Sequence, residues 1–244
     1  MPTLILAGQP ASLLQRLDKQ GWQGQLLDPL ATPAAPSWPR LADAAQAGQL
    51  TAPRLWIAAC ATPPPLAPGD LYIDTGTTPL AGIPAEQHIS LAFQDSPFAA
   101  DHGFLLAVGG RRQAIEAARK LLDALAPQPD GWLHAGGLQA PHFMAALASE
   151  LGVGLAMQAA TMASLQQSGP AALWLGQQAI SARLAALAAT YLAEHDDAGF
   201  EPVHSLPPAF AQLSSEAIAP AQFLARTLLW LASPPNTGAG SATK

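Results

Sequence analysis

The segments that decide the fold of this chain read LAPGDLYID over residues 66–74, DHGFLLAVGGRRQAIEAARKLLDALAP over 101–127, and GWLHAGGLQAPHFMAALASELGVG over 131–154. They contain two strand-like runs, then the turn Gly109-Gly110, an amphipathic helix, a short strand and a long apolar helix. This order of elements predicts an α/β domain that is followed by an all-α domain.

The composition is that of a folded protein with a large core. Half of the 244 residues are apolar, 11% are charged, and the net charge is −6. The eleven Lys and Arg residues are scattered along the chain. Because duplex nucleic acid needs a basic face to neutralise its phosphates, we expect no nucleic-acid binding.

The single cysteine and the hydropathy pattern indicate a soluble protein. Cys60 stands alone, which excludes an intrachain disulfide and a zinc site built on several thiolates. No apolar run is expected to reach the roughly 18 residues that a spanning helix needs. We therefore expect a cytoplasmic protein that does not enter a membrane.

The N-terminal residues have the pattern of a β-α-β unit. Residues 3–7 predict a strand, 11–20 a helix, and 25–28 a second strand that ends in Asp28. Asp28 lies twenty residues after Gly8, about where a dinucleotide-binding unit places its ribose-binding carboxylate. This pattern favours a Rossmann-like domain with a mostly parallel sheet.

The turn of this unit departs from a phosphate-binding loop. Such loops carry G-x-G-x-x-G, because glycines let the backbone approach a pyrophosphate at the helix N-terminus. Here the turn has a single glycine, Gly8, and Pro10 has no N–H to donate. Ser12 could bind a phosphate or cap the helix. The turn therefore disfavours the binding of NAD or NADP in the usual mode. Binding of one of these cofactors is kept as an alternative.

The sequence also predicts that a helix is missing farther along, where only ten residues separate Cys60 from Leu71 and four of them are proline. Parallel strands usually need a longer, helical crossover, so the α/β domain is expected to be trimmed. From Pro141 onward the sequence predicts helices over 141–167, 170–195 and about 215–233, with a break between the first two at Ser168-Gly169-Pro170.

These elements predict three regions along the chain. The Rossmann-like domain covers 1–136, the helical domain covers 137–234, and residues 235–244 form a disordered tail.

Three blocks resemble the 6-phosphogluconate dehydrogenase and β-hydroxyacid dehydrogenase family. Residues 66–78 are similar to its LxPGDxxIDGGNS motif, 102–110 to RGYCLMIGG, and 142–154 to HFVKMVHNGIEYG. The blocks follow the family's order, and the resemblance extends more weakly over most of the chain, with the amino-terminal domain shortened. The resemblance implies an NAD(P)-binding domain and a helical domain through which members pair, so we expect a homodimer.

The residues at the family's functional positions differ from those of the family. The resemblance places the general base at Ala145, two substrate-holding residues at Ala148 and Ser149, and a later acid at Gly152. Glu150 lies two residues away from that acid position, about 200° around a helix. General acid–base catalysis contributes about 10²–10⁴-fold, and an alanine methyl cannot carry a proton. The resemblance therefore implies a member that has lost the family reaction.

Other polar residues would still line the cleft at the carboxyl ends of the strands. His142 and Asp95 are the catalytic candidates, Gly8, Gln9, Ser12, Asp28 and Cys60 the cofactor-binding candidates, and Asp74, Thr77, Gln94 and Ser96 the substrate-binding candidates. His142 could equally cap or pack the first turn of its helix. The run His195-Asp196-Asp197 is interpreted as a helix end, and no metal site is expected.

Three functions remain open on these grounds. The first is a catalytically inactive relative of 6-phosphogluconate dehydrogenase that serves as a dimeric binding or regulatory protein. The second is an active NAD(P)-dependent oxidoreductase for a small hydroxy acid or sugar acid, with Asp28 on the ribose and His142 or Asp95 at the chemistry. The third is a scaffold whose pocket is filled by side chains such as Trp56 or Phe98.

Overall fold

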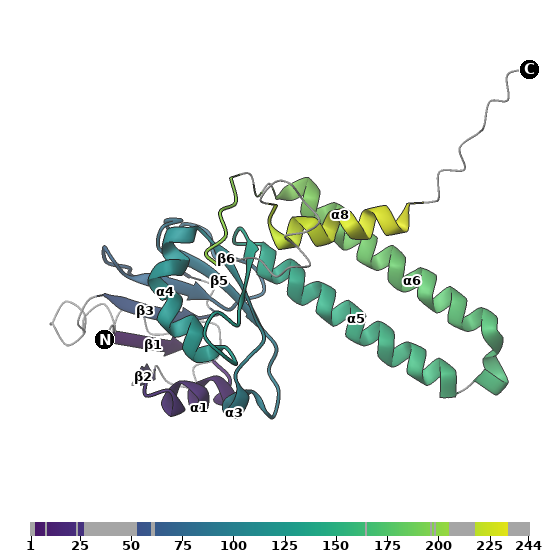
Figure 1. Ribbon diagram of the computed structural model, residues 1–244, viewed down its shortest axis with the longest axis horizontal. Helices are drawn as coiled ribbons and strands as arrows, with labels where there is room; N and C mark the ends of the chain where they lie inside the picture. The colour runs from purple at the N-terminus through teal and green to yellow at the C-terminus, as the bar shows by residue number, and fades with distance from the viewer. Residues whose placement is uncertain are drawn as a thin grey trace, which may run out of the picture. The chain divides into compact units, whose positions relative to one another are not determined.

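The computed structural model describes residues 3–7, 9–22, 24–26, 53–59, 62–163, 165–195, 197, 199–204 and 218–233 (Figure 1). Its strands are β1 (Thr3–Ala7), β2 (Gly24–Leu26), β3 (Arg54–Ala58), β4 (Leu71–Asp74), β5 (His88–Phe93), β6 (Leu106–Gly110) and β7 (Leu133–Gly136). Its helices are α1 (Ala11–Lys19), α3 (Ala99–His102), α4 (Arg112–Leu125), α5 (Ala140–Ala163), α6 (Leu165–Glu194) and α8 (Pro220–Ala232).

The described strands form one seven-stranded sheet in the order β2-β1-β3-β4-β5-β6-β7. All neighbouring strands are parallel except β5 and β6, which are antiparallel with Ile89 opposite Gly110. The predicted class, a mostly parallel Rossmann-like α/β domain followed by helices, is confirmed.

The two faces of the sheet are covered differently. On one face, strand residues such as Ile73 and Val108 pack with the apolar sides of α1 and α4, where Leu13 and Ile115 are fully buried. The apolar positions of α4 recur every three or four residues, which gives the helix one buried side. On the other face, a smaller cluster around Trp56 packs against side chains of connecting segments. No helix crosses between β3 and β4 over residues 62–70, so that prediction is confirmed.

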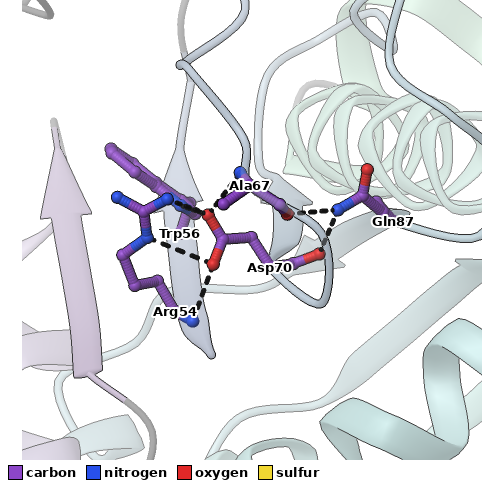
Figure 2. Close-up of polar contacts among 5 residues, drawn as sticks. All are labelled: Arg54, Trp56, Ala67, Asp70 and Gln87. Carbon is purple, nitrogen blue, oxygen red and sulfur yellow. Dashed lines mark hydrogen bonds and ion pairs between the residues drawn. The ribbon is translucent and has the colours of Figure 1, made fainter. Parts of the chain in front are cut away.

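Asp70 holds the connection that replaces the missing crossover helix (Figure 2). Its carboxylate accepts hydrogen bonds from the backbone N–H groups of Arg54 and Ala67, both at 2.9 Å. It also accepts from Arg54 Nε at 3.1 Å and Trp56 Nε1 at 3.5 Å, and it pairs with Arg54 Nη2 at 2.6 Å. Gln87 Nε2 donates to the carbonyls of Ala67 and Asp70. The buried carboxylate thus joins β3 to the segment before β4, and Gln87 joins that segment to the connection that follows β4.

Contacts divide the chain into two compact units. The first contains residues 1–145 and 197–221, and the second contains 146–196 and 222–244. The first unit therefore extends past residue 136 into the start of α5, and a segment from beyond α6 returns to it. The predicted tail, 235–244, lies outside the described residues.

The returning segment packs against β7 and the turn after it. Asp197 Oδ1 accepts a hydrogen bond from the backbone N–H of Gly137 at 2.8 Å. The Phe200 ring lies 4.7 Å from the His134 ring, between centroids. Because α6 ends at Glu194, the run that begins at His195 does end a helix, as interpreted from the sequence.

Acid is expected to destabilise this region through His134, which is only 1% exposed. Burial lowers the pKa of His134 from its ordinary 6.5 to about 4. The folded chain therefore binds a proton at His134 less readily than the unfolded chain does. The contribution of neutral His134 to the free energy of unfolding is complete above pH 6.5 and is lost as the pH falls toward 4. The difference between the pKa of His134 in the unfolded and in the folded chain corresponds to about 3 kcal/mol of unfolding free energy. Urea unfolding at pH 7 and pH 4.5 should show a smaller acid-dependent loss for His134→Gln than for the wild type. Equal losses would contradict this prediction.

The second unit contains an antiparallel hairpin of α5 and α6. Glu150 Oε2 and Arg183 Nε are 2.8 Å apart, and the Cα of Gly154 lies so close to α6 that an added Cβ would be 2.7 Å from Ile180. The predicted helix break at 168–170 is wrong, because the backbone is helical from Leu165. Good helix formers on both sides outweigh the hydrogen bond lost at a proline.

Two further predictions from the sequence need correction, one for α8 and one for α5. The helix predicted from residue 215 begins only at Pro220 within the described part, where a proline suits the first helical position. The span Ala140–Ala160 of α5 is long and apolar enough, by length and composition alone, to cross a membrane, and 17% of its most apolar part is buried. The core helix of a soluble protein, which is mostly buried, can have the same length and composition. The expectation that no segment has this length and composition was therefore wrong.

Candidate functional site

Gln9 occupies the carboxyl ends of the first strands. It lies two residues after the end of β1, and its Nε2 donates to Ala7 O at 3.0 Å, Thr75 Oγ1 at 2.9 Å and Ile57 O at 3.4 Å. These acceptors come from β1, from β3 and from the residue after β4. Open α/β sheets bind ligands at this end of the strands. The amide of Gln9 is therefore held by the chain's own backbone at the place where a cofactor would approach.

Ser12 and Asp95 form a second contact at this end of the sheet. Ser12 lies in the first turn of α1, and its hydroxyl donates to Asp95 Oδ1 at 2.6 Å. Asp95 follows β5 and is exposed. The N-cap of α1 is Pro10, without a side-chain cap, so Ser12 does not cap the helix. A negative charge thus lies beside the helix N-terminus where a dinucleotide would bring its pyrophosphate.

Asp74 is buried and bound by the connection that follows it. One carboxylate oxygen accepts from the Gly76 N–H at 2.8 Å, and the other accepts from the Leu80 N–H at 2.7 Å. The second oxygen also lies 3.5 Å from Nε2 of His88, a residue that is fully buried. Neither ring nitrogen of His88 has a hydrogen-bond partner among the described residues. In this structure Asp74 anchors the β4–β5 connection.

His142 contacts the sheet through Ser90. His142 Nε2 and Ser90 Oγ are 2.8 Å apart, and Ser90 is the register partner of Asp74 in the neighbouring strand. Burial lowers the pKa of His142, while the Asp74 carboxylate raises it and His88 lowers it further. The imidazole is therefore neutral at pH 7. A neutral imidazole can take up a proton, which is the property that a general base requires.

The other predicted residues have separate places. Thr77 and Gln94 are exposed, and Ser96 is half-buried, with its carbonyl accepting from Ala99 at the start of α3. Gly8, Asp28 and Cys60 lie outside the described residues. The cofactor and substrate roles of the predicted residues therefore stay predictions.

Sequence reasoning missed Thr75, His88 and Ser90. A signal was present for two of them, because His88 and Ser90 alternate with apolar residues along β5 and must share one face of the sheet. Their proximity to Asp74 depends on the pairing of β4 with β5, which no local pattern reveals. In the part of the chain that the structure describes, no three His, Cys, Asp or Glu side chains gather to hold a metal ion.

The positions that the resemblance assigns to catalysis lie along α5. Ala145, Ala148, Ser149 and Gly152 are all exposed there. None of these residues has a side chain that exchanges a proton near neutral pH. The nearest carboxylate in sequence, Glu150, is bound to Arg183.

Comparison with known proteins gives distant similarities only. No family model and no curated protein matches the chain. Among solved structures, it is similar to Plasmodium falciparum 6-phosphogluconate dehydrogenase, described in its apo form and with NADP+ or 6-phosphogluconate, at 12% identity and a TM-score of 0.49. That similarity covers 68% of this chain and 44% of the other, so the chain spans less than half of that protein.

A second similarity is to Psf3, solved in complex with NADP+ and 2-OPP, at 16% identity and a TM-score of 0.42 over 92% of each chain. Identities and scores this low say nothing about what the present chain binds. The fold is assigned from its own strand order.

Proposed function

We propose that this chain is a 6-phosphogluconate dehydrogenase-like protein that no longer catalyses the family reaction and acts as a dimeric binding or regulatory protein. The proposal is supported by the exposed Ala145, Ala148 and Gly152 on α5, which stand where the resemblance implies a base, a substrate contact and an acid. Without such groups, about 10²–10⁴-fold of rate is lost for each proton transfer.

The proposal rests mainly on one observation. The chain's own polar groups occupy the carboxyl ends of the strands, where a cofactor would bind. The Gln9 amide is bound to two strand carbonyls and to Thr75, and the Asp95 carboxylate lies against Ser12. A phosphate placed about 4 Å from a carboxylate is repelled by about 1 kcal/mol in water and by about 4 kcal/mol near a protein surface. These residues do not fit NAD or NADP in the usual mode.

The alternative is an active NAD(P)-dependent oxidoreductase with relocated acid–base groups. It is favoured by one observation, the neutral His142 imidazole beside Ser90 and near the Asp74 carboxylate. In that case His142 would exchange the proton of a small hydroxy acid or sugar acid.

Isothermal titration of the protein with NAD+, NADH, NADP+ and NADPH decides between the two functions. We expect no heat of binding up to millimolar concentrations. Micromolar binding by the wild type would overturn the proposal and favour the oxidoreductase.

The variant Asp95→Asn tests the electrostatic reason. Removing about 1 kcal/mol of repulsion should tighten any residual binding about fivefold. Asp18→Asn removes an equally exposed carboxylate from the opposite end of α1 and should change nothing.

A further inference from the structure

The connection between β5 and β6, residues 94–105, is anchored to the rest of the first unit. Ala99 and Phe104 are each 1% exposed and belong to the main core cluster of the sheet. Within the connection, α3 packs beside α1 (Figure 1), and Ser12 of α1 donates to Asp95 at 2.6 Å. The chain itself therefore holds this segment in place, as is usual for a ligand site that is formed before its ligand arrives.

Two large apolar side chains of this anchored connection are nonetheless exposed. Phe98 is 69% exposed and Leu105 is 70% exposed, although each is next in the chain to a buried residue, Ala99 or Phe104. Their exposure therefore does not result from a loose segment. Both lie at the carboxyl end of β5, because β6 runs antiparallel to it and begins there. At this end of an α/β sheet, exposed apolar side chains offer a surface to a ligand.

The two side chains belong to residues close to the carboxylate of Asp95. Asp95 and Phe98 are three residues apart, which limits the separation of their Cα atoms to about 11 Å. The backbone N–H of Gln94 donates to the carbonyl of Leu105 at 3.4 Å, so Leu105 lies beside the residue that precedes Asp95. One small molecule is therefore long enough to contact the carboxylate and the apolar side chains together.

The charge at this place is negative. One oxygen of Asp95 accepts from Ser12, and the other accepts no hydrogen bond from the residues that the structure describes. The two basic residues of α1 have other partners, since Arg16 donates to three backbone carbonyls and Lys19 pairs with Asp101. The N-terminus of α1 contributes only about half a positive charge, which does not cancel a full carboxylate. A cation is therefore stabilised where a phosphate is repelled.

We propose that Asp95, Phe98 and Leu105 bind a small organic cation, namely an amine attached to an apolar or aromatic body. The ammonium group donates a charge-assisted hydrogen bond to the second oxygen of Asp95, and the body packs on Phe98 and Leu105. The face of the Phe98 ring also attracts the cation. This inference rests on the binding role proposed above and names the class of its ligand.

The size of the apolar surface favours a small molecule over a protein as the ligand. Phe98 and Leu105 together expose an area on the order of 250 Å², whereas each partner of a stable protein complex buries roughly 800 Å². Among the described residues of the connection they are the exposed large hydrophobic side chains. A molecule of one ring and a short amine-bearing chain matches this area.

Titration of the full chain with 2-phenylethylamine, followed by heteronuclear NMR of the backbone amides, tests the proposal. The amine is positively charged at neutral pH. We expect a dissociation constant of about 1 mM, which is typical of a ligand with about nine non-hydrogen atoms, and the largest shifts over residues 94–105. The anion 3-phenylpropanoate has a similar body and should bind at least about tenfold more weakly, because Asp95 repels it.

Two variants separate the charge from the apolar surface. Asp95→Asn keeps an oxygen for Ser12 and should raise the dissociation constant of the amine about fivefold, whereas it tightens any residual nucleotide binding. Phe98→Ala should raise the dissociation constant of the amine by a similar factor. Asp18→Asn and Trp230→Ala are the matched controls, since Asp18 is an exposed carboxylate of α1 and Trp230 is 74% exposed in the second unit. All four side chains are exposed, so each variant is expected to fold.

Every other outcome overturns the inference. The absence of shifts up to about 10 mM amine would do so, as would equal binding of the amine and the anion. So would unchanged amine binding in Asp95→Asn and Phe98→Ala, or an equal weakening in the two controls. Nucleotide titration is read separately. Binding of NAD or NADP contradicts the non-catalytic function whether or not the amine binds, and a silent amine titration leaves that function standing.

Discussion

Replacing Asp70 by Ala is expected to lower the free energy of unfolding by about 3–5 kcal/mol, because it leaves the buried guanidinium of Arg54 without its counter-charge. Arg54 is 5% exposed and Asp70 is fully buried, so water cannot replace the lost carboxylate. The N–H groups of Ala67 and Trp56 lose an acceptor as well. Urea unfolding followed by circular dichroism measures the change.

The control for this prediction is an ion pair of the same type on the surface. Arg112 and Glu116 pair at 2.8 Å on α4, with both side chains nearly half exposed. Glu116→Gln should cost less than about 0.5 kcal/mol, because exposed helix pairs contribute little. Asp70→Asn keeps the shape of the side chain and one acceptor oxygen. Its loss of unfolding free energy should therefore fall between those of Asp70→Ala and Glu116→Gln. If Asp70→Ala and Glu116→Gln cost the same, the Asp70 network does not hold the β3–β4 connection.

The sequence predicts the local elements well, because each has its own periodicity. The helix over 112–125 and the strand over 71–74 lie within the segments where the sequence predicts an amphipathic helix and a strand, since their apolar residues recur with helical and buried-strand patterns. The antiparallel pairing of β5 with β6 was not foreseen, because strand direction depends on how distant segments meet. The break predicted at 168–170 failed for a related reason, namely that single Gly and Pro residues are weaker signals than long helical flanks.

The candidate site could be predicted only in part. Gln9, Ser12 and Asp95 were expected at the carboxyl ends of the strands, because the end of each strand can be located from sequence. Their mutual contacts were not expected, since Ser12 and Asp95 are far apart in the chain and meet only through the order of the sheet. The scaffold function predicts that side chains such as Trp56 or Phe98 fill the pocket. In the structure Trp56 lies in the core, whereas Phe98 is 69% exposed.

The exposure of apolar residues on α5 and α6 could likewise not be predicted from the periodicity of the sequence. The apolar residues of α5 and α6 predict helices with a buried side, but they cannot reveal what buries it. Leu155 and Trp174 are exposed, so the sequence pattern alone does not reveal which apolar positions of these helices are buried.

Gly109→Ala is expected to lower the free energy of unfolding by about 3 kcal/mol or more, through overpacking where the sheet meets the start of α5. A Cβ on Gly109 would lie 2.2 Å from the carbonyl oxygen of Gly137 and 2.5 Å from Cδ of Pro141. Both groups belong to the rigid backbone or to a proline ring, so neither can move as a flexible side chain would. β6 would have to separate from the turn that begins α5, and the Ser90–His142 hydrogen bond would be disturbed with it.

The same substitution at Gly152 should have the opposite sign. Gly152 lies inside α5, and nothing stands within 4 Å of the place where its Cβ would be. Alanine there should stabilise the chain by about 0.5–1 kcal/mol, because it lowers the entropy of the unfolded chain and favours helix. Both variants gain one methyl group, so urea unfolding at one protein concentration isolates the effect of position. A loss of less than about 1 kcal/mol for Gly109→Ala would show that β6 and the α5 turn are not in close contact, and the placement of His142 against Ser90 would fall with it.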